Sequence, residues 1–79
     1  MQKLTNESIL NARQWFIENL QACIREAQAG TFHVNDLPAY VANCQKRIKE
    51  FEEGRNDHTF SLRQTAYYIQ TGESLPLLP

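Results

Sequence analysis

Residues 7–30, ESILNARQWFIENLQACIREAQAG, contain neither proline nor glycine before Gly30, and they predict one long amphipathic helix. Thr5 or Asn6 can cap its N-terminus, and Gly30 suits the left-handed position that follows many helices. With residues placed roughly 100° apart, the apolar side chains fall within an arc about 160° wide. These side chains are Ile9, Leu10, Ala12, Phe16, Ile17, Leu20, Cys23, Ile24 and Ala27. We therefore expect a helix over residues 6–29 with one face packed into a core.

A second helix is expected over residues 36–53. Asn35 or Asp36 can cap it, and its first turn accepts Pro38, where the missing N–H has no partner to lose. Its apolar residues are separated alternately by four and three positions, which is the spacing of a helix that packs along a narrow seam against a neighbouring helix. They are Leu37, Val41, Cys44, Ile48 and Phe51.

A third, shorter helix is predicted over residues 60–71 and closed by Gly72, although its apolar residues occur all round. The link between the first two helices is short, so they should pair antiparallel. The sequence thus predicts an all-α domain: a helical hairpin plus a third short helix, like a three-helix bundle. An extended apolar tail over residues 73–79 should follow, since Pro76 and Pro79 oppose helix.

The chain is short and nearly neutral, with 79 residues and a formal net charge of −1. A single domain over residues 1–79 is expected, in a size range where one core supplies only about 3–5 kcal/mol. The charge gives no general attraction for a phosphate backbone, so nucleic acid is an unfavoured partner. No stretch is apolar enough for a membrane span, and the N-terminus MQKLTNES lacks the core of a signal peptide. A cytoplasmic location is expected.

The hairpin predicts which residues face one another. If the turn centres near Phe32 and His33, Phe16 lies opposite Ile48, and Arg13 lies opposite Glu52. Arg13 projects from the apolar arc, where a lone charge is costly, so a partly buried Arg13–Glu52 ion pair is the hypothesis. The alternative is that Arg13 lays its stem over the core and carries its guanidinium to water.

No constellation of residues indicates catalysis, a cofactor or a metal site. The three glycines are isolated at helix ends, and His33 and His58 fall at opposite ends of the hairpin. Cys23 and Cys44 fall within about one turn of each other, and we expect thiols in a reducing compartment, with their redox state left open. The chain is interpreted as a non-enzyme.

Aromatic and apolar residues exceed what one hairpin needs. Trp15 lies about 60° outside the apolar arc, and Trp and Tyr are enriched at binding hot spots. Trp15, Tyr67 and Tyr68 are therefore candidate interface residues, with the alternative that they pack the third helix onto the hairpin. The tail adds Leu75, Leu77 and Leu78, which can dock on their own chain, dock on a partner, or stay free.

The favoured function is a small protein–protein interaction module, a homodimeric adaptor, inhibitor or regulator that also binds another protein. A short chain with more apolar surface than it can bury gains stability from a second copy. The alternative is a DNA-associated regulator of helix-turn-helix type, with Arg63, Gln64 and Gln70 offered to bases.

Overall fold

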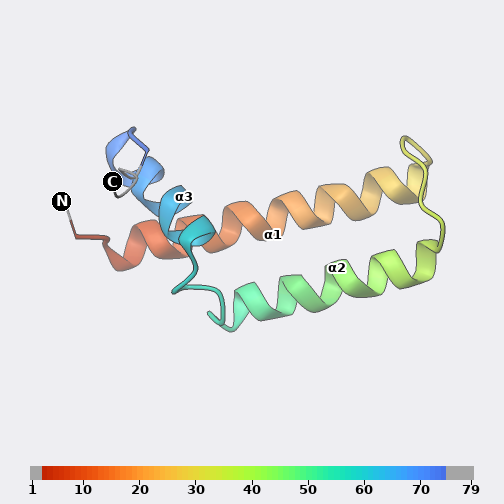
Figure 1. Ribbon diagram of the computed structural model, residues 1–79, viewed down its shortest axis with the longest axis horizontal. Helices are drawn as coiled ribbons and strands as arrows, with labels where there is room; N and C mark the ends of the chain where they lie inside the picture. Colours follow the sequence, from red (N-terminus) through yellow and green to blue (C-terminus); the bar gives the residue numbers. More distant parts are fainter. Residues whose placement is uncertain (1–2, 75–79) are drawn as a thin grey trace.

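The computed structural model describes residues 3–74 and contains three helices, α1 (Asn6–Ala29), α2 (Leu37–Glu52) and α3 (Phe60–Thr71) (Figure 1). The all-α fold class predicted from the sequence is confirmed. The helix bounds also agree with the sequence pattern to within one residue at each end.

Each helix begins at a capping side chain, and for α1 and α2 it is one of the two residues expected from the sequence. Thr5 accepts a hydrogen bond from the Ser8 N–H, Asp36 from Ala39 and Thr59 from Leu62. Each of these bonds satisfies one of the backbone donors that the first helical turn leaves free. The helix boundaries therefore follow from local chemistry.

The two shorter helices pack against different parts of α1. α2 runs back along α1 as the second arm of a hairpin, while α3 packs near the N-terminal end of α1 (Figure 1). Within residues 3–74, α2 and α3 do not pack against each other. The radius of gyration is 14.6 Å, against about 12 Å for a compact domain of this length. The fold is thus elongated, with α1 as the element that both other helices share.

The core follows the inner face of α1 and continues onto both partner helices. Its buried members are Ala12, Ile17, Leu20, Cys44, Phe51, Leu62 and Ala66. Phe16 stacks on Phe51 with ring centroids 4.8 Å apart. Phe51 lies three residues along α2 from Ile48, the residue expected opposite Phe16, so the observed register is close to the predicted one.

The side chain of Gln70 ties the C-terminal turn of α3 to the start of α1. Its Oε1 accepts the Thr5 N–H at 2.9 Å and lies 2.9 Å from the Ser8 hydroxyl, while its Nε2 donates to the Lys3 carbonyl at 2.8 Å. Ser8 is the buried polar residue of the described core, only 3% exposed. Gln70 therefore gives the Thr5 N–H its partner and offers a second acceptor to the Ser8 hydroxyl, which also lies 2.9 Å from the Thr5 carbonyl.

Replacing Gln70 with alanine should lower the free energy of unfolding by about 1–2 kcal/mol, because three hydrogen bonds that join α3 to the start of α1 are lost at once. Urea denaturation measures the change. Gln14→Ala is the matched control, since Gln14 makes one exposed hydrogen bond, to Glu18. Equal effects for the two variants would contradict the role assigned to Gln70.

Candidate interaction surface

Trp15 lies on the flank of α1 with 49% of its surface exposed. Its ring meets the Phe16 ring edge-on at a centroid distance of 5.0 Å, and the Asn19 amide donates to the Trp15 carbonyl. The indole thus packs on one ring beside the core while about half of its surface faces solvent. A large ring fixed in this way can contact a partner with little further loss of side-chain freedom.

The two adjacent tyrosines of α3 have different environments, because consecutive residues on a helix point about 100° apart. Tyr68 is 60% exposed, whereas Tyr67 is buried at 8%. For Tyr67 the structure favours the alternative of packing inside the molecule, which leaves little of its ring for a partner. The tail residues Leu75, Leu77 and Leu78 lie outside the described residues.

Further exposed apolar side chains accompany Trp15 and Tyr68. Leu10, Phe60 and Ile69 are 54%, 58% and 41% exposed, and Phe32 is 39% exposed at the closed end of the hairpin. Leu10 could be anticipated, because it sits on α1 beyond the last turn of α2. The exposure of Phe60 and Ile69 could not be anticipated, because apolar residues occur all round the third helix and its sequence does not show which face is buried.

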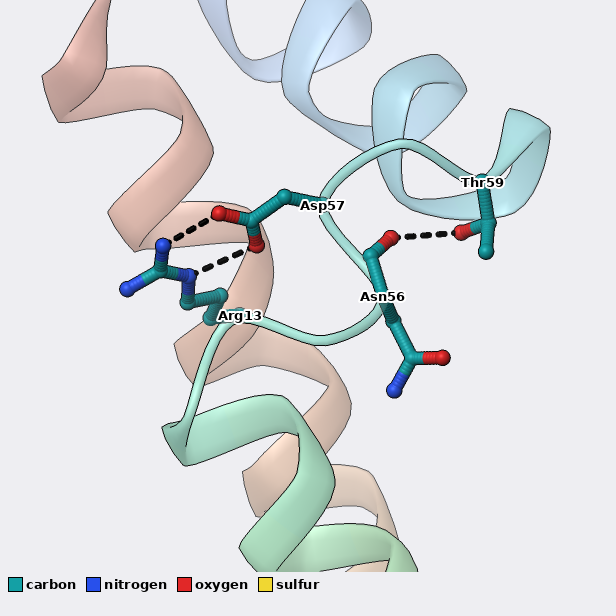
Figure 2. Close-up of polar contacts among 4 residues, drawn as sticks. All are labelled: Arg13, Asn56, Asp57 and Thr59. Atoms are coloured by element: carbon teal, nitrogen blue, oxygen red, sulfur yellow. Dashed lines mark hydrogen bonds and ion pairs between the residues drawn. The ribbon is translucent and has the colours of Figure 1, made fainter.

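The carboxylate that pairs with Arg13 is Asp57 in the loop before α3, so the prediction of Glu52 is wrong (Figure 2). Arg13 Nε donates to Asp57 Oδ1 at 2.8 Å, and Nη2 bonds Asp57 Oδ2. Glu52 is exposed and lines a shallow cleft of about 350 Å³ beside Arg13. The loop turns at Gly54, whose φ of +77° is left-handed, and this turn brings Asp57 back to α1.

The ion pair shifts both ionisation equilibria. Hydrogen bonding from Arg13 lowers the pKa of Asp57 below its ordinary range, with a smaller contribution from His58. The same bond raises the pKa of Arg13. Both side chains remain about one quarter to one third exposed, so solvent screens the pair and its net contribution stays modest.

The pair should make stability depend on acid pH. The pKa of Asp57 is lower in the folded chain than in the unfolded chain. The pair therefore contributes fully to the free energy of unfolding above the ordinary aspartate pKa of about 3.9, and this contribution is lost as the pH falls through the folded pKa. Asp57→Asn should therefore be less stable than the parent by about 1 kcal/mol at pH 6. The difference should shrink below about pH 4. Thermal melting of both chains from pH 2.5 to 7 measures it, and a constant difference would contradict the assignment.

Thiol, imidazole and carboxylate groups are the side chains that could hold a metal ion. Cys23 and Cys44 are free thiols, and His33 bonds Asn35 in the loop between α1 and α2. Among residues 3–74, no group of three or more His, Cys, Asp or Glu side chains is placed to hold a metal ion. In the same part of the chain no helix combines the length and apolarity that crossing a bilayer requires.

Comparison with family models, curated proteins and solved structures finds no match to this chain.

Proposed function

We propose that this chain is a small non-enzymatic protein-interaction module, a cytoplasmic adaptor, inhibitor or regulator that acts as a homodimer. The observation that carries the proposal is a set of large apolar side chains that stay exposed on two helices packed against each other. Leu10 and Trp15 on α1, and Phe60 and Tyr68 on α3, are 49–60% exposed. Exposed apolar surface beyond scattered single residues is typical of a protein interaction site.

The chemistry of the exposed residues supports protein as the partner. Trp15, Tyr68 and Phe60 are large apolar rings on two helices that pack against each other, and aromatic residues dominate interface energetics. The two free thiols suit a reducing compartment.

The arrangement of the helices weighs against the DNA-binding alternative. In a helix-turn-helix motif the first helix supports the recognition helix, but α2 and α3 are not packed together in the described chain. Gln70, one of the three side chains offered to bases, is occupied by Lys3, Thr5 and Ser8. Arg63 is the one cation on α3.

Sedimentation equilibrium between 1 and 100 µM tests the proposal, with a reversible monomer–dimer equilibrium as the expected result. Trp15→Ser should raise the dimer dissociation constant at least tenfold, because it removes the largest exposed ring of α1. Phe32→Ser is the control, since Phe32 is a similarly exposed ring at the far end of the hairpin. A monomer throughout this range would refute the homodimer, and equal effects of the two variants would refute the assignment of Trp15 to its interface.

A second measurement separates the two classes of partner. Fluorescence anisotropy with a labelled DNA duplex at low salt should show no binding by the parent chain. Binding that weakens steeply as salt rises would instead support the DNA-associated regulator.

A further inference from the structure

Cys23 on α1 and Cys44 on α2 lie at the same level of the hairpin. Phe16 stacks on Phe51 with ring centroids 4.8 Å apart, which fixes the register of the two antiparallel helices (Figure 1). Cys23 follows Phe16 by seven residues, and Cys44 precedes Phe51 by seven residues. Seven residues make about two helical turns, so each cysteine lies on the same face of its helix as the phenylalanine. Both are displaced equally toward the closed end of the hairpin, and the two thiols therefore face each other.

The side chain of Tyr40 is a second indication that the thiols are close together. Tyr40 lies one turn before Cys44 on α2 and packs against the core. Burial raises the pKa of Tyr40, and interactions of its phenol with Cys44 and Cys23 raise that pKa further. A single phenol group can interact with both sulfurs only where α1 and α2 bring them near one another.

The packing of two helices suits a covalent bond at this position. Helices in contact have axes about 8–10 Å apart, and Cα atoms lie about 2.3 Å from the axis. Residues that face each other directly therefore have Cα atoms about 4–6 Å apart, and a disulfide spans about 4.4–6.8 Å. The two thiols also differ in access, since Cys44 is 6% exposed and Cys23 is partly exposed. Cys23 can meet a small molecule, whereas Cys44 can meet Cys23.

We propose that Cys23 and Cys44 form a redox modification site that reacts with a low-molecular-weight disulfide and closes to a bond between α1 and α2. The Cys23 thiolate attacks one sulfur of the small disulfide, whose S–S bond breaks, and its other half leaves as a thiolate. The Cys44 thiolate then attacks Cys23 Sγ and displaces the second half. The protein thiols give up two electrons and two protons, and the small disulfide takes them up to become two small thiols.

Mass spectrometry of the full chain tests the proposal, with oxidised glutathione as the probe and N-ethylmaleimide to trap free thiols. We expect a monomeric product that is lighter than the reduced chain by two hydrogen atoms and carries neither label nor glutathione. Trypsin cuts after Arg25 and so separates the two cysteines, and their peptides should remain joined until reduction. A chain that keeps its thiols, stops at the glutathione adduct or links only to a second chain would overturn the proposal.

Two variants show whether the facing geometry is responsible. Cys44→Ser should stop at the glutathione adduct on Cys23, because it lacks the second thiol. Adding Gln45→Cys restores a thiol about 100° round α2, on the exposed side, and closure should be at least tenfold slower than in the parent. Closure at the parental rate would show that the register does not bring the thiols together. The measurement on the parent needs no substitution and decides the matter even where a variant fails to fold.

Thermal melting supplies an independent measurement. The bridge should raise Tm by about 8 °C or more, because it constrains the unfolded chain, and dithiothreitol should restore the original Tm. An unchanged or lower Tm would contradict the facing geometry, since the bond would then distort the hairpin. The rise should not depend on protein concentration, whereas stabilisation by a dimer does. A bridged chain that sediments as a monomer would therefore overturn the homodimer and leave this site standing.

Discussion

Leu62→Ala should lower the free energy of unfolding by about 3 kcal/mol, the largest effect that we expect from a single truncation in this chain. Leu62 is the largest side chain that is fully buried, and it lies in the core between α3 and α1. Truncation leaves a cavity in the core cluster that also contains Ala12 and Ala66, whose side chains are too small to fill it. A core of this size supplies only about 3–5 kcal/mol in total, so the docking of α3 should be nearly lost.

In the Leu62→Ala variant, α3 should unfold before the rest of the chain. Because α3 packs on α1 and not on α2, native-state hydrogen exchange should show that amides of α3 lose protection before those of α2. Leu10→Ala is the matched control, since Leu10 is the same residue type at 54% exposure, and it should change stability by less than about 1 kcal/mol. Equal loss of protection in α2 and α3 would contradict the view that the two helices dock separately on α1.

Helices and their ends could be predicted because they depend on local chemistry. Thr5, Asp36 and Thr59 cap the helices through bonds to residues three positions away, and Gly30 and Gly72 take the left-handed positions after α1 and α3. None of these features requires knowledge of the rest of the fold. Periodicity then indicated which face of α1 would be buried.

The partner of Arg13 could not be predicted in the same way. The hairpin register placed Glu52 at the right level, and Glu52 does line the cleft beside Arg13. The carboxylate that reaches the guanidinium comes from a loop, whose path depends on the left-handed turn at Gly54 and has no periodic pattern to reveal it. Tyr67 and Tyr68 posed a related problem, because only the direction from which α3 meets α1 decides which ring is buried.

Gly54→Ala should destabilise the chain by about 2 kcal/mol, through two separable effects. The first is backbone strain, since a left-handed conformation costs a residue with a Cβ about 1 kcal/mol or more. The second is steric: a Cβ at this position would lie 2.8 Å from Arg13 Nη2 and 3.2 Å from Asp57 Oδ2. The guanidinium must move away, and the ion pair must weaken with it.

Comparison with Gly30→Ala separates the steric effect from the backbone strain. Gly30 has a φ of +79°, close to the +77° of Gly54, but a Cβ there would meet nothing within 4 Å. The excess cost of Gly54→Ala over Gly30→Ala should therefore equal the contribution of the Arg13–Asp57 pair, about 1 kcal/mol. In an Arg13→Ala background the 2.8 Å contact and the ion pair are both absent, so the two glycine variants should cost nearly the same. If Gly54→Ala kept its full excess cost there, as measured by urea denaturation, the excess would not come from Arg13 and Gly54 would have no part in positioning the pair.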